Sequence, residues 1–331
     1  MLETVEQRNA LLASIERARG SSVIAYILHD NAVIADDAIP HLHDKLQAIG
    51  RRERIDLLLY ARGGAPEVCW RVLNLLRQHC DHLGLIVGHR VQGAASILAL
   101  GADEIVIGPL SELGGIEAAR RHPLMPRDEL GQPVPLSFGE LKAALEFLAQ
   151  YGGEAGEGQE QEGRHRGLLA AFLQQIHPIV IGHLHQADRL ARQVTRKALL
   201  MHMHPEDREK IERIVDLFNG GFHSPLYTVT ATELAGMGLH VAEADHDMWA
   251  HIWNLVQLYQ SALYTDRPDQ TQPGAFFRYL CLIESVGRLT GLRQSFTQVE
   301  GQERVLNIRW ETAIRAGGPG PSFGPGGMSN N

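Results

Sequence analysis

The sequence IVGHRVQGAASILALGADEIVIGP (Ile86–Pro109) contains the pattern that decides the fold. An apolar run that ends at His89 predicts a buried strand, Gly93 marks a turn, and 93–101 predicts a short apolar helix. The run at 103–109 predicts a further strand. Strands that are apolar throughout and joined by helices are typical of a parallel sheet covered on both faces. We therefore expect an α/β fold with the Gly93 turn at the end of a central strand.

The same alternation continues on both sides of this stretch. The predicted elements are strands at 22–29, 55–64, 83–89 and 103–109, and helices at 36–49, 65–80, 93–101, 138–152, 168–202, 205–218 and 245–263. Residues 230–241 predict a short helix followed by a strand. Three alternating runs within 275–313 predict antiparallel strands with turns at Gly287 and Gly301.

The chain is expected to divide into four parts. These are an N-terminal helix at 1–20, an α/β domain at 21–265, a β-rich extension at 266–315 and a disordered tail at 316–331. The Gly/Glu/Gln-rich stretch at 152–167 predicts a mobile loop inside the α/β domain.

Composition limits the classes of function. The chain has 331 residues and a formal net charge of −8, so it has no basic excess for nucleic acid. Its three cysteines, Cys69, Cys80 and Cys281, lie in or beside apolar runs and are interpreted as reduced core thiols. We find neither a signal-peptide pattern nor a run of 18 apolar residues. We expect a cytoplasmic protein that does not span a membrane.

Two turns are candidates for binding or chemistry. One is Ala61–Gly64, between a predicted strand and helix, and the other is the turn at Gly93. Loops at the carboxyl ends of parallel strands line the ligand crevice of such sheets, so the two turns could lie side by side. Outward-pointing amides of a glycine pair at a helix start can bind an oxyanion. The alternative is a tight turn that binds no ligand.

Four segments, in order, carry a family resemblance. They are IADDAIPHLHDKL (34–46), IDLLLYARGGAPE (55–67), GHRVQGAASILALGADEIVIGPLSELGGIEA (88–118) and NGGFHSPLYTVTATELAGMGLHV (219–241). They resemble the Clp-protease/crotonase superfamily and, within it, the serine dehydrogenase proteinase family, which is related to signal peptide peptidase A. The resemblance implies a parallel sheet of repeated β-β-α and βα units flanked by helices, with helical and antiparallel C-terminal extensions. It also implies a homo-oligomer.

The resemblance weakens where the chemistry should be. The family's nucleophilic serine falls on Gly93, which has no oxygen with which to attack a carbonyl group. Arg62 stands where the family has proline, and Ala65 stands where it often has aspartate. A later element, LGGIE (113–117), replaces the family's LGPID. The resemblance thus implies a protease-like fold with an impaired active site.

Ser96 and His223 are the remaining candidates for catalysis. Ser96 follows Gly93 by three helical positions, about 4.5 Å further along the axis, whereas an error of about 1 Å can abolish efficient attack. A serine in a first helical turn is more often a cap or a packing residue. His223 matches a histidine-containing family segment, so it is interpreted as a base, as part of the cleft wall or as a loop histidine bonded to backbone.

Three functions remain open. The first is a catalytically impaired protein that binds a peptide or protein partner, or serves as a scaffold subunit, with Gly63, Gly64, Gly93 and Ala94 as its oxyanion-hole or cleft residues. The second is an active hydrolase that uses Ser96 with His223. The third is crotonase-like acyl-thioester chemistry, which needs a carboxylate near the donor turns; Glu112 and Glu117 are the candidates.

Seventeen histidines raise the question of a metal site. The pairs His183/His185 and His202/His204 are each two residues apart and would not share a helix face, whereas zinc pairs on helices are three or four apart. We expect neither a metal nor another cofactor.

A basic stripe is predicted on the long helix at 168–202. Arg189, Arg192 and Arg196 recur at helical spacing, with Lys197 beside them. We interpret the stripe as a solvated face or as one side of ion pairs between subunits.

Overall fold

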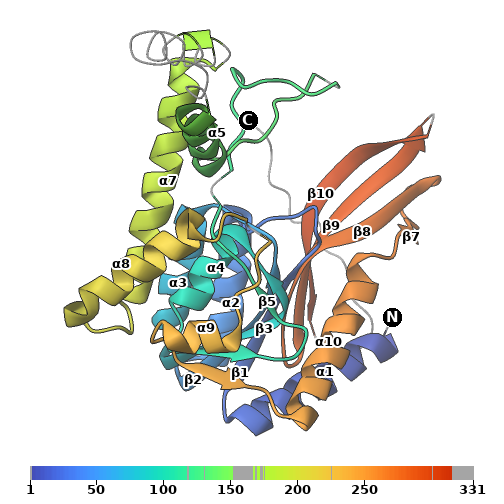
Figure 1. The fold of residues 1–331 in the computed structure, drawn as a ribbon. Helices are drawn as coiled ribbons and strands as arrows, with labels where there is room; N and C mark the ends of the chain where they lie inside the picture. Colours follow the sequence, from blue (N-terminus) through green and yellow to red (C-terminus); the bar gives the residue numbers. More distant parts are fainter. Residues whose placement is uncertain are drawn as a thin grey trace.

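The computed structural model describes residues 2–314 except 118, 130, 152–166, 168, 169, 172, 173, 175, 225 and 300. Within this part, the chain is an α/β protein with a mixed sheet that is parallel in one half, antiparallel in the other, and flanked by helices (Figure 1). The predicted tail at 316–331 and nearly all of the predicted loop at 152–167 lie outside the described residues.

One sheet connects all the strands of the described part. Its order is β10-β9-β8-β1-β2-β3-β4-β6, with β5 paired to β3 and β7 paired to β8. The parallel strands are β1 (Ser22–Leu28), β2 (Arg52–Ala61), β3 (Cys80–Val91), β4 (Glu104–Ile107), β5 (Glu112–Leu113) and β6 (Val241–Glu243). The antiparallel strands are β7 (Arg267–Pro268), β8 (Ala275–Ser285), β9 (Arg288–Val299) and β10 (Gln302–Ile314).

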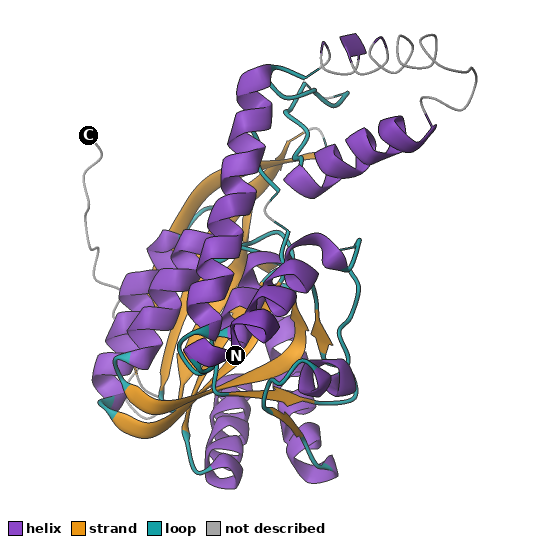
Figure 2. Cartoon of the chain, turned by 60° about the vertical axis from the view of Figure 1, so that its left-hand side comes forward, coloured by secondary structure: helices purple, strands orange, loops and turns teal. Residues whose placement is uncertain are grey.

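Helices cover both faces of the parallel strands (Figure 2). α1 (Leu2–Arg19) and α10 (His246–Leu263) pack on one face. The opposite face is covered by α2 (Ile39–Ile49), α3 (Pro66–Arg77), α4 (Ser96–Leu100), α7 (Pro178–Leu199), α8 (Arg208–Asp216) and α9 (Ala231–Gly236). Since both faces are covered, the central strands must be apolar throughout, which is the pattern that the sequence shows.

Local sequence explains where these elements begin and turn. α3 begins at Pro66, whose fixed φ suits the first helical position, and Asp245 caps α10 by accepting a hydrogen bond from the Met248 amide. Gly287 and Gly301 have φ values of +77° and +78°, as the β8–β9 and β9–β10 turns require. The predicted hairpins at 275–313 are therefore confirmed.

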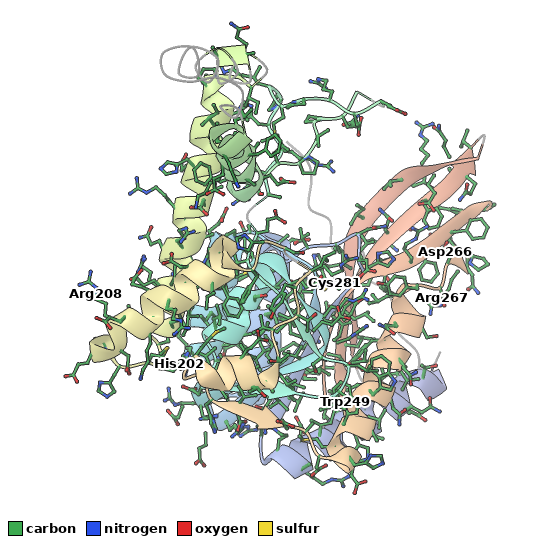
Figure 3. The ribbon with its side chains drawn as sticks, in the orientation of Figure 1. His202, Arg208, Trp249, Asp266, Arg267 and Cys281 are labelled. Carbon is green, nitrogen blue, oxygen red and sulfur yellow. The ribbon has the colours of Figure 1, made fainter. Side chains whose placement is uncertain are left out.

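The C-terminal strands do not form a sheet of their own. β8 pairs with β1 in antiparallel register, with Ala25 opposite Glu284 and Leu28 opposite Cys281. Cys281 is buried where the two strands meet (Figure 3), and all three cysteines are buried and free. One sheet thus continues across the predicted boundary between 265 and 266.

The helical region after β5 differs in part from its prediction. α5 (Phe138–Tyr151) and the first turns of α7 project away from the sheet (Figure 2) and share a small core of Met125, Leu141, Val180 and Leu184. The continuous helix predicted at 168–202 is wrong, because non-helical Ile176 and His177 precede α7. α8 ends at Asp216, where a π-helical segment containing the non-helical Asn219 follows.

Candidate functional site

The turns that follow β2 and β3 lie against each other, as predicted. The two strands pair at Ala61 and Val91, and the Gln92 amide donates a hydrogen bond to the Ala61 carbonyl oxygen, 3.0 Å away. A Cβ atom placed on Gly93 would lie 3.3 Å from the Cα of Gly63. A side chain at position 93 would therefore face the turn at Gly63.

The turn at Gly63 and Gly64 offers two backbone donors. Ile34 fixes it from the side: its amide donates to the Gly63 oxygen at 3.1 Å, and its oxygen accepts from the Ala65 amide at 3.4 Å. A Cβ on Gly64 would lie only 2.8 Å from the Ile34 Cβ, so a side chain does not fit. Among the described residues, no acceptor pairs with the amides of Gly63 and Gly64. They stand just before α3, where the helix dipole favours a carbonyl oxygen or an anion.

The turn at Gly93 contributes less than predicted. Gly93 has a φ of +60°, and its amide donates to the Gly115 carbonyl oxygen, 2.9 Å away. Its N–H is therefore already used, and Gly93 does not act as an oxyanion-hole donor in this conformation. Ala94 is buried at the second position of the 3₁₀ turn Gly93–Ala95, where an amide has no partner within the turn. The candidate donors are thus the amides of Gly63, Gly64 and Ala94.

Ser96 is a structural residue in this arrangement. Its side chain is fully buried, and Oγ lies 2.8 Å from the carbonyl oxygen of Gly114 and 3.2 Å from that of Val91. A nucleophilic serine must instead give its proton to a base. Because Ser96 donates to backbone and has no contact with solvent, the geometry argues against the predicted nucleophile.

His223 lies in the loop that follows α8 and is exposed. Its φ of +56° is the only positive value for a non-glycine residue in the described part of the chain, and its amide donates to the Gly220 oxygen at 3.2 Å. No hydrogen bond joins its ring to Ser96 among the described residues. The structure therefore does not assemble the predicted Ser96–His223 pair.

The two candidate carboxylates are not placed as a pair of acids. Glu112 forms an ion pair with Arg90, with Oε2 2.9 Å from Nε. Glu117 directly follows the Gly114–Ile116 segment, and its side chain is half-buried. Glu112 is thus held as a structural partner of β3.

Exposed apolar side chains flank the turns, and the sequence analysis did not identify them. Val33 is 57% exposed and lies beside Gly63, where a Cβ would be 3.7 Å from its Cγ1. Near Gly115, which accepts the hydrogen bond of the Gly93 amide, Phe222 stacks with Tyr227, and the adjacent Leu226 is 64% exposed. The apolar pair Leu226–Tyr227 in a Gly- and Ser-containing loop was the available signal.

The histidines do not form a metal centre within the described residues, where no group of three or more potential ligand side chains occurs. His202 (Figure 3) instead places Nε2 2.9 Å from the Leu100 carbonyl oxygen, and burial lowers the pKa of its ring.

Comparisons with family models, with curated proteins and with solved structures gave no match to this chain. Among the described helices, none combines the length and apolar character that crossing a membrane requires.

Proposed function

We propose that this chain is a Clp-fold, serine-protease-like protein with an impaired active site, which binds a peptide or protein partner at the turns that follow β2 and β3. One observation carries the proposal: position 93 faces the donor turn at Gly63, yet it carries only hydrogen. A site with backbone donors and no nucleophile can hold a carbonyl group without cleaving it.

The surroundings of the turns favour a peptide as the ligand. The amides of Gly63 and Gly64 can donate to the carbonyl oxygens of an extended chain. Val33 and Leu226 are more than half exposed; Val33 borders the turn at Gly63, and Leu226 belongs to the loop whose Phe222 packs near Gly115. Exposed apolar side chains beside free backbone donors are typical of a surface that binds another chain.

The two alternatives have less support. A hydrolase that uses Ser96 would need a rearrangement to free its hydroxyl group from the carbonyl oxygens of Gly114 and Val91. Crotonase-like chemistry would need a carboxylate at the donor turns, whereas Glu112 is paired with Arg90. We expect a homo-oligomer on the family resemblance.

Fluorescein-labelled casein tests binding and cleavage with one probe. We expect its fluorescence anisotropy to rise on binding, with no increase in fluorescence from cleavage. Val33→Asp and Leu226→Asp should each weaken binding by about tenfold, because they place a charge on the apolar surface. Val286→Asp is the matched control, since Val286 is 44% exposed in the β8–β9 turn, at the opposite end of the strands.

The proposal fails if casein does not bind, or if both variants bind it as tightly as the unmodified protein. Cleavage that disappears in Ser96→Ala would instead establish the hydrolase. Saturable binding of a coenzyme A ester that is lost in Glu112→Gln would support the crotonase-like alternative.

A further inference from the structure

A hollow lies on the face of α7, apart from the turns at Gly63 and Gly93. It has a volume of about 1110 Å³ and is bounded by the start of α3 at Glu67, the segment Arg120–Arg121, and the α7 residues from Gly182 to Arg196. The elements that bound it can be followed in Figure 1, where α7 and α3 are labelled and lie close to each other. Five arginines line this hollow, which we call the α7 groove: Arg120, Arg121, Arg189, Arg192 and Arg196.

Three of these arginines are neutralised within the chain. Arg120 pairs with Glu67 at 3.4 Å. Glu67 is also the one residue with a carboxylate among the described residues that line the groove. Arg192 pairs with Asp188 at 3.0 Å and with Asp216 at 2.6 Å. Arg196 forms a two-point contact with Glu212 on α8. These pairs fix the groove wall, and because Arg192 meets two carboxylates, their acids outnumber their arginines by one.

The other two arginines remain without a carboxylate. Arg121 and Arg189 are exposed, and within the described part of the chain neither forms an ion pair or a hydrogen bond through its side chain. Arg121 and Arg189 are distant in sequence, yet the side chains of both line this one hollow. The groove therefore presents two unpaired guanidinium groups. With the four paired acids counted against the five arginines, its local charge is about +1, although the whole chain has a net charge of −8.

The charge and the donor geometry favour one class of ligand. A guanidinium group presents a planar fork of N–H donors that matches the oxygens of phosphate. A phosphate monoester carries a charge of about −1.5 to −2 at pH 7, which balances two unpaired arginines. The amide side chains of Gln186 and Gln193, which also line the groove, can donate further hydrogen bonds. We propose that the α7 groove binds a ligand that carries a phosphate group between Arg121 and Arg189.

This inference does not depend on peptide binding at the turns, so either proposal can fail alone. Isothermal titration calorimetry at low ionic strength would measure the binding of inorganic phosphate, glycerol 3-phosphate and succinate. We expect both phosphates to bind and succinate to bind much more weakly. Binding should weaken as salt is added, because the contact is electrostatic and exposed.

Variants identify the residues responsible. Arg121→Gln and Arg189→Gln should each weaken phosphate binding by about tenfold or more, and the double variant should abolish it. Arg304→Gln is the matched control, because Arg304 is exposed on β10 and does not line the groove. Since Arg121 and Arg189 are exposed and unpaired, the midpoint of thermal unfolding should not change. Should Arg121→Gln prove unstable, Arg121→Lys keeps the charge without the fork and should still weaken binding.

Three results would overturn the proposal. The first is that neither phosphate binds the unmodified protein at millimolar concentration. The second is that the double variant binds phosphate as tightly as the Arg304→Gln control. The third is that succinate binds as tightly as glycerol 3-phosphate, which would show that the groove does not select phosphate.

Discussion

The hydroxyl group of Ser96 lies 2.8 Å from the carbonyl oxygen of Gly114, inside the protein, and donates a hydrogen bond to it. This bond links the first residue of α4 to the residue that follows β5. A second link runs from the Gly93 amide to the Gly115 oxygen. The turn after β3 is thus tied to the Gly114–Gly115 segment by both its backbone and its serine.

Ser96→Ala is expected to affect stability without affecting any hydrolysis. The change leaves the buried Gly114 oxygen without its donor, which should lower the free energy of unfolding by about 1 kcal/mol. Chemical denaturation measures this loss, and labelling with a fluorophosphonate should be absent in both proteins. Labelling of the unmodified protein that disappears in Ser96→Ala would contradict this assignment.

Gly93→Ala tests how tightly the two turns are packed. At a φ of +60° an alanine is strained, and its Cβ would also lie 3.3 Å from the Gly63 Cα. Gly274→Ala is a matched control, because Gly274 has a φ of +78° with open space around its Cβ position. We expect a loss of about 1 kcal/mol for the control and a larger loss for Gly93→Ala, measured by urea denaturation. Equal losses in the free energy of unfolding would show that the two turns can move apart to accept the Cβ atom without further cost.

The buried ion pair of Arg8 and Glu284 connects α1 to β8. Arg8 Nε lies 2.7 Å from Glu284 Oε2, and the exposed fractions of the two side chains are only 4% and 0%. Arg8→Met would leave a buried carboxylate without its partner, at a cost of about 3–5 kcal/mol. The double variant with Glu284→Leu should recover much of this loss in the same denaturation experiment. A single variant as stable as the unmodified protein would refute this expectation.

Asp269 should make stability depend on acid pH. Burial alone would raise its pKa, but hydrogen bonds from Thr271 and Ser295 and the charge of Arg293 lower it from 3.8 to about 2. The folded state therefore binds this proton less readily than the unfolded state. The resulting stabilisation is complete well above pH 4 and is lost as the pH falls towards 2.

The comparison with Asp269→Asn isolates this effect. At pH 7 the free energy of unfolding of the variant should be about 1–2 kcal/mol lower than that of the unmodified protein. The difference should shrink as the pH approaches 2, where about half of the native carboxyl groups have become neutral. A difference that stays constant between pH 7 and pH 2 would show that Asp269 stabilises the strands through packing alone.

Much of the fold could be predicted because local signals determine it. Continuous apolar runs indicated the central strands, and Gly287 and Gly301 indicated the hairpins. The pairing of β8 with β1 was not predictable, because register between distant strands depends on tertiary packing. For the same reason, the sequence suggested two separate regions where the structure has one sheet.

Prediction of the candidate site from the sequence was limited for the same reason. The sequence correctly predicted that the turns at Gly63 and Gly93 lie together, because they follow neighbouring parallel strands. It could not show that Ser96 donates to carbonyl oxygens, because one acceptor lies eighteen residues away along the chain. Nor could it show that Arg192 and Arg196 form ion pairs with Asp216 and Glu212 on α8, which corrects their assignment to solvent or another subunit.

The attachment of β8 to β1 has a consequence for protein synthesis. β1 is synthesised about 250 residues before β8, its neighbour on one side. Until β8 is made, the hydrogen-bonding edge of β1 is open to other strands, which is a condition that promotes aggregation. A nascent chain of this protein should therefore depend on chaperones until β8 has emerged.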